Sequence, residues 1–226
     1  MDTTILSPAD RDAIAAAVGA AEARANGEIV TVIAHSSDSY ADVALAWSAG
    51  IAGLALLTIT LASGFYLGLI DRLLGLWAHD WTAREILEFA LFVGSVKFAG
   101  MWVILLWRRL RLWLTPGRIK AARVRARAVA AFRLAAQGRT QGSTGVVIYL
   151  SMAERRAEIF ADAAIAAKVA PEIWGDAMHA MLAEIRHGRV AEGMVAGVAH
   201  VGQVLAAHFP RESRGPNELP DGPIEL

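Results

Sequence analysis

Two long apolar stretches dominate the pattern of hydrophobic and polar positions along the chain. Residues 44–70 carry no charged side chain, and residues 86–107 carry only Glu88 and Lys97. As a helix, each stretch is long enough to cross a hydrocarbon layer of about 30 Å. The short segment between them contains two tryptophans, which favour the interface between membrane and water. The pattern therefore predicts a hairpin of two transmembrane helices.

The sequence before this hairpin has the pattern of a soluble α/β element. Ser7 and Pro8, with Asp10 three positions after the serine, are typical of a helix start, where a side-chain oxygen accepts from a free backbone amide. The helix should run to about Ala25, where an Asn-Gly pair supplies a stop. The β-branched residues of segment 28–34 then predict a strand.

The sequence after the hairpin continues in the same style. Apolar positions at helical spacing predict a helix over residues 119–137. Two strands follow at residues 145–151 and 156–162, joined by a turn at 152–155. Pro171 opens the first of two further helices.

These elements predict an α/β fold, a small mixed sheet covered by helices, with the two-helix transmembrane hairpin inserted into it. The near-continuous apolar run VVIYL is typical of a strand that is buried on both faces. Residues 1–43 and 114–210 are expected to form the two parts of this domain, and residues 44–113 the hairpin. Two crossings return the chain to the compartment it left, so both parts can complete one sheet. Residues 211–226, rich in proline, glycine and acidic residues, are predicted to be a disordered tail.

Composition agrees with a membrane protein and excludes several classes of site. The chain has 226 residues, is 55% hydrophobic and has a mean hydropathy of +0.41. Basic and acidic residues balance at 22 each, so no overall positive field indicates a nucleic-acid partner. The absence of cysteine excludes disulfides, thiolate metal sites and cysteine nucleophiles.

The strongest charge signal is a basic cluster that follows the second apolar stretch. Basic residues near the ends of spans are retained on the cytoplasmic side, so we expect both termini and the α/β domain to be cytoplasmic, on a bacterial inner membrane. The cluster is either a solvated amphipathic helix or a direct contact with anionic lipid headgroups. It comprises Arg108, Arg109, Arg111, Arg118, Lys120, Arg123, Arg125 and Arg127.

Other polar residues are weaker candidates for a function. Arg155 and Arg156 are candidates for clamping a phosphate or another anion, although with Glu154 they also fit a solvated hairpin turn. Lys97 lies near the middle of the second stretch, where its charge is costly unless it faces a partner helix or extends to the interface. No histidine pair at helical metal-ligand spacing and no nucleotide-binding motif occurs.

Two blocks of the sequence carry a resemblance to a known family. The later block reads GVVIYLSMAERRAEIFADAAIAAKVAPEIW and continues in GRVAEGMVAGVAHVGQVLAAHFP. It resembles the C-terminal half of the TPM domain, a small α/β domain of membrane-associated proteins. The earlier block, LSPADRDAIAAAVGAAEARANGEIVTVIA, is similar to the opening helix and first strand of that domain. The familiar members have an uninterrupted domain, so the inserted hairpin is a departure from the family pattern.

Two functions stay open for this chain, because its catalytic candidates do not form a coherent site. We expect a membrane-anchored accessory, binding or assembly factor without enzymatic activity, acting on a protein partner or as a homo-oligomer. The alternative is a divalent-metal-dependent phosphatase, because some family members are credited with phosphatase activity or with binding of divalent metals. In that case the resemblance places a Ca²⁺ or Mg²⁺ ligand at Asp162, although the same carboxylate also fits a helix cap. Whether the protein is an enzyme stays open at this point.

Overall fold

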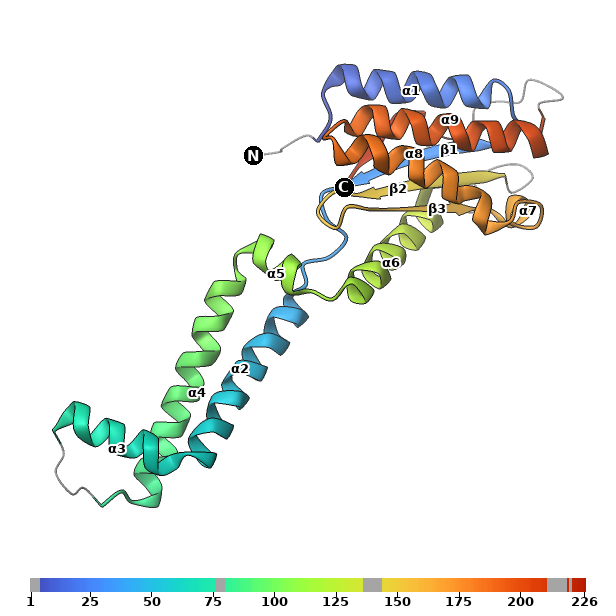
Figure 1. Cartoon of the computed structure of the whole chain (residues 1–226). Helices are drawn as coiled ribbons and strands as arrows, with labels where there is room; N and C mark the ends of the chain where they lie inside the picture. The colour runs from blue at the N-terminus through green and yellow to red at the C-terminus, as the bar shows by residue number, and fades with distance from the viewer. Residues whose placement is uncertain (1–4, 76–79, 136–143, 211–218, 220) are drawn as a thin grey trace. The chain divides into compact units, whose positions relative to one another are not determined.

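The computed structural model describes residues 5–75, 80–135, 144–210, 219 and 221–226 (Figure 1). The chain divides into two compact units. One unit combines Met1–Asp38 with Gly117–Leu226, and the other is the intervening Ser39–Pro116.

The first unit is built on a mixed sheet of four strands in the order β3-β2-β1-β4. β1 runs parallel to both of its neighbours, β2 and β4, whereas β3 is antiparallel to β2. The expected mixed α/β sheet is therefore confirmed. The strands span Glu28–Ala34 (β1), Gly145–Ser151 (β2), Arg156–Ala161 (β3) and Ile224–Glu225 (β4).

The fourth strand corrects the prediction of a disordered tail. Leu226 donates its amide to the Ile33 carbonyl (2.9 Å), and His35 donates to the Leu226 carbonyl (3.0 Å). β1 would otherwise present an unpaired edge of amide and carbonyl groups, and the last residues of the chain satisfy it. Composition alone predicted disorder because it carries no information about the edge of β1 that the tail pairs with. Residues 211–218 and 220 lie outside the described residues.

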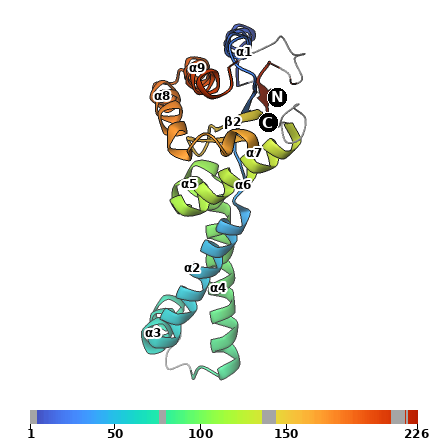
Figure 2. The same ribbon diagram turned by 90° about the vertical axis from the view of Figure 1, so that its right-hand side faces the viewer.

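Helices cover both faces of the sheet (Figure 2). One apolar core lies between the sheet and three helices and includes Ile29, Ile148 and Val198. A second core, with Val147 and Val124, lies between the other face and a single helix. β2 is consequently buried on both sides, as its apolar run predicts, whereas the edge strand β3 is half-buried. The three helices are α1 (Pro8–Glu22), α8 (Trp174–Arg186) and α9 (Val190–His208), and the single helix is α6 (Gly117–Ala135).

Short elements complete this unit. The helical turn α7 (Ala163–Ala166) and the 3₁₀ turn η1 (Pro171–Ile173) connect β3 to α8. The predicted helix over 119–137 corresponds to α6, whose last predicted residues fall in segment 136–143, outside the described residues.

The second unit contains four helices in its described residues, and the first two of them replace a single helix that the sequence predicted. The predicted helix over 44–70 is broken at Ala62, whose φ of −126° and ψ of 39° are not helical. Thr58 and Thr60 donate their hydroxyls to backbone carbonyls one turn earlier, a bond that weakens and bends helices. The helices are α2 (Ala41–Leu61), α3 (Ser63–Leu74), α4 (Ala83–Leu105) and α5 (Arg108–Leu114).

Three helices in the described residues are long and apolar enough to cross a membrane: α2, α4 and α9. α9 buries eight residues in the α/β unit, so packing there accounts for its apolar composition. α2 and α4 pack against each other and expose large apolar side chains such as Leu57 and Leu91. These two helices indicate that the protein associates with a membrane.

Candidate functional site

A cluster of polar side chains lies where the parallel strands β1 and β2 end. The Glu154 carboxylate accepts from the Ser37 amide (3.1 Å) and the Ser36 hydroxyl (3.2 Å), and it also receives the Ser151 hydroxyl. Ser37 Oγ lies 2.9 Å from Ser151 Oγ and 3.1 Å from the Tyr149 hydroxyl. Glu154 thus ties the loop after β1 to the turn after β2. It is buried, at 8% exposure, which corrects the interpretation of its turn as solvated.

The electrostatics of this cluster favour a structural role. Burial raises the pKa of Tyr149, while the hydrogen bond with Ser37 and the charge of Arg127 act in the opposite direction. The phenol therefore stays protonated at neutral pH and is not a base. The Glu154 carboxylate already accepts three hydrogen bonds, and Ser151 is fully buried. The cluster fixes a loop rather than presenting a reactive hydroxyl.

Two arginines hold the positions at which the chain leaves and re-enters the α/β unit. Arg123, on α6, forms an ion pair with Asp38, the last residue before the second unit (3.2 Å). Arg156, at the start of β3, donates to the carbonyl of Gly117, the first residue after it (3.4 Å). Both junctions are therefore fixed within the α/β unit itself.

Asp162 has a local structural role at the end of β3. Its side chain accepts from the Gly145 amide (3.3 Å), and its own amide donates to the Gly145 carbonyl (2.8 Å). It is 6% exposed and precedes α7 without a capping bond from its side chain. In the described part of the chain, no three histidine or acidic side chains gather to hold a cation. A Ca²⁺ or Mg²⁺ at Asp162 therefore stays a prediction.

The two arginines predicted to clamp an anion have different surroundings. Arg155 is exposed and has a φ of +51°, an unusual backbone conformation for a residue with a side chain. Arg156 is half-buried and close to Glu158 as well as to Gly117. Burial raises the pKa of Glu158, and Arg125 and Arg156 act against that rise. An anion clamp at Arg155 and Arg156 stays a prediction.

The predicted basic cluster is divided between the two units. Arg108, Arg109 and Arg111 lie on α5, and the other members lie on α6. On α6, Arg125 stands over the ring of Phe160 at 5.8 Å, a cation–π contact. Lys97 is exposed on the surface of α4, and its contact with a partner helix or with the interface stays a prediction.

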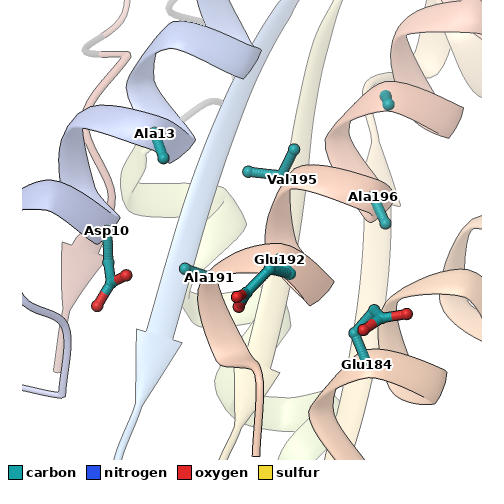
Figure 3. A pocket seen from close by; sticks show the side chains of 8 residues that line it. Asp10, Ala13, Glu184, Ala191, Glu192, Val195 and Ala196 are labelled. Carbon is teal, nitrogen blue, oxygen red and sulfur yellow. The ribbon is translucent and has the colours of Figure 1, made fainter.

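The sequence analysis missed an open groove on the helical face of the α/β unit (Figure 3). The groove has a volume of about 540 Å³ and lies along α9, between α1 and α8. Five small apolar residues line it, and one carboxylate from each helix lies toward the end where α9 begins. The apolar residues are Ala13, Ala191, Val195, Ala196 and Ala199, and the carboxylates are Asp10, Glu184 and Glu192.

The three carboxylates of the groove differ in their partners. Asp10 forms a capping box with Ser7, whose hydroxyl and amide lower the pKa of the Asp10 carboxyl. Glu184 pairs with Arg189 at 2.6 Å. Glu192 lies exposed in the first turn of α9, where the helix dipole stabilises its charge. The groove therefore combines a small apolar floor with negative charge at one end.

Residues of the groove were hard to find in the sequence because each has an ordinary local explanation. In the sequence, Asp10 is explained by a helix cap, and Glu192 is explained by its place in the first turn of a helix. The alternation of alanine, glycine and valine along α9 is a signal of close helix packing, but it does not say which face remains open. Only the meeting of three helices creates the groove.

The comparisons with known proteins agree with this architecture. The family model for the TPM domain matches residues 114–204, which include α6, β2, β3 and α8. This chain contains a TPM domain. The match begins at residue 114, within the last residues of the second unit, and the structure adds α1 and β1 to the same domain from the other side of the insertion. The resemblance seen in the sequence is therefore confirmed.

A solved structure supports the same fold over the full length. It is the NMR structure of the BA42 protein from the psychrophilic bacterium Bizionia argentinensis, with a TM-score of 0.57 and 16% sequence identity. The alignment covers 100% of this chain and 99% of that one. At this identity the likeness shows the fold alone. The comparison with curated proteins gives no match.

Proposed function

We propose that this protein is a membrane-anchored TPM-domain module that binds other proteins at the bacterial inner membrane and assists their assembly without catalysing a reaction. The observation that carries the proposal is the groove along α9. Its floor of small side chains fits a closely packed helix or extended segment, and its three carboxylates favour a partner with lysine or arginine. The hydrogen bonds of the polar cluster around Glu154, in contrast, hold a loop in place, which is a structural role.

The proposed topology places both termini and the TPM domain in the cytoplasm. Basic residues follow the end of α4 directly, at Arg108, Arg109 and Arg111. The opposite end of the hairpin has fewer basic residues, Arg72 and Arg84. An excess of basic residues is retained on the cytoplasmic side, which supports this orientation.

A photoreactive amino acid tests the groove in the intact membrane. Placed at Ala196, on the groove floor, it should form discrete adducts with another protein. Placed at Ala207, which is exposed on the same helix and does not line the groove, it should not. Glu192→Lys should abolish the adducts from position 196, and Glu172→Lys, an exposed charge reversal outside the groove, should leave them unchanged.

The same preparation tests the phosphatase alternative. The full-length protein in detergent is supplied with a phosphate monoester and either Mg²⁺ or Ca²⁺. Turnover that is lost in Asp162→Asn, together with no adducts from position 196, would favour the enzyme over the binding module. Adducts without turnover are the expected result.

A further inference from the structure

We propose that α5 is an interfacial helix that binds the anionic phospholipid surface on the proposed cytoplasmic side of the membrane. This inference rests on the membrane anchoring proposed above and is independent of the groove along α9. The surface that α5 recognises is a layer of negatively charged lipid headgroups over an apolar interior.

The position of α5 follows from its neighbours in the second unit. α4 ends at Leu105, and α5 begins at Arg108. At the other end of α5, the indole N–H of Trp47 donates to the Leu114 carbonyl at 3.4 Å. Trp47 lies in the second turn of α2. α5 is therefore held at the level where one span-length helix begins and the other ends, which is the membrane interface if the hairpin spans the membrane.

The side chains of α5 have the arrangement that an interfacial helix requires. Leu110, Trp113 and Leu114 are spaced so that they share one face of the helix. Arg108 falls on the opposite face beside Leu112, and Arg109 and Arg111 lie at the two borders between the faces. Arginines opposite and beside an apolar face that contains tryptophan are typical of helices that lie in the plane of a membrane surface.

The exposed apolar groups at this end of the hairpin need a cover. Trp113 is 77% exposed, Trp107 67% and Leu106 63%. Tryptophan is enriched at membrane interfaces, where its ring lies among apolar chains and its N–H meets polar groups. With Trp47 and Trp102, the described residues place four tryptophans at this end of the hairpin.

Charge decides which lipid fits. The three arginines of α5 compare with one acid, Asp42, in the first turn of α2. An anionic leaflet attracts such a group, and the attraction weakens as salt screens it. A zwitterionic surface offers the apolar contact without this attraction.

Single-cysteine labelling tests the proposal cleanly because the chain has no cysteine of its own. Trp113→Cys carries an environment-sensitive dye in the full-length protein, which is reconstituted into vesicles of phosphatidylcholine with or without phosphatidylglycerol. Brominated lipids report contact of the dye with acyl chains. Leu57→Cys, exposed within α2, carries the same dye and reports whether the hairpin is inserted.

The expected result is strong quenching at position 57 in every vesicle and quenching at position 113 that increases with phosphatidylglycerol. Arg108→Gln and Arg109→Gln should each lower the ratio of bound to released α5 by roughly fivefold, and high salt should act in the same direction. Equal quenching at position 113 in neutral and anionic vesicles would overturn the proposal. Absence of quenching at position 57 would overturn it together with the membrane anchoring, whereas the groove would be judged separately by its own adducts.

Discussion

Glu225 joins the last strand of the TPM domain to its first helix. Its carboxylate accepts from the Ile5 amide and from Arg11 Nε, both at 2.8 Å, and forms an ion pair with the Arg11 guanidinium. Burial acts to raise the pKa of Glu225, but the amides of Ile5 and Leu6 and the Arg11 charge outweigh it, so the pKa is lowered overall. The ionised form is therefore the one that stabilises the folded state.

Glu225→Gln should destabilise the TPM domain at neutral pH and have little effect in acid. A folded-state pKa below the unfolded value gives stability that is present above the unfolded pKa, near the ordinary glutamate value of 4.5, and is lost as pH falls through the folded pKa. Denaturant unfolding of the full-length protein in micelles, followed by circular dichroism at several pH values, measures the difference. Glu172→Gln, an exposed change on η1, is the control. Equal midpoints for Glu225→Gln and wild type at pH 7 would contradict the role of Glu225.

At the scale of elements, α9 organises one face of the domain because small residues let two helices approach it. A Cβ added at Gly202 would lie 2.6 Å from the Cβ of Ala21 on α1. One added at Gly193 would lie 2.7 Å from the Met181 carbonyl on α8. The helices that form the groove are therefore held at distances that only glycine permits.

Gly202→Ala should destabilise the domain by about 1–3 kcal/mol, because the new methyl group must separate α9 from α1. Gly175→Ala, on α8, is the matched control, since a Cβ there has nothing within 4 Å. That control should stay within about 1 kcal/mol of wild type and gains in helix propensity. Denaturant melts of the full-length protein compare the two. A smaller loss for Gly202→Ala than for Gly175→Ala would show that α1 and α9 are not closely packed.

At the scale of the whole molecule, the TPM domain is interrupted in sequence but continuous in its packing. Its two segments, before and after Ser39–Pro116, share one sheet through the pairing of β1 with β2. Arg123 and Arg156 fix the two junction residues, Asp38 and Gly117, to the domain. The inserted segment therefore leaves and re-enters the domain at fixed residues, and the domain has its own core.

Replacing Ser39–Pro116 by a short Gly-Ser linker should leave a soluble TPM domain that unfolds cooperatively. The cost of closing a loop rises only by about 0.6 kcal/mol for each doubling of its length, so linker length should matter little. Size-exclusion chromatography and a denaturant melt measure the outcome, with a linker of doubled length as the control. Aggregation or a gradual loss of structure with both linkers would mean that the second unit is needed for folding.

Much of this fold follows from local patterns in the sequence. The β-branched run of β1 and the apolar run of β2 predict buried strands, and the capping signature at Ser7 predicts the start of α1. These features can be predicted because the spacing of apolar residues and helix capping depend on neighbouring residues alone. The apolar stretches likewise predict α2 and α4. The same reasoning located Asp162, Arg155 and Arg156 near strand ends, but it did not give their partners.

Tertiary structure decided the features that depend on residues far apart in the chain. The edge of β1 is filled by Leu226, and Glu154 is buried because the loop with Ser36 and Ser37 closes over it. The groove exists because Asp10, Glu184 and Glu192 come from three helices that meet. The spacing of hydrophobic residues along a helix or strand determines which of its sides faces a core. Which edge remains to be paired, and which surface remains open, is set only when the elements have packed against one another.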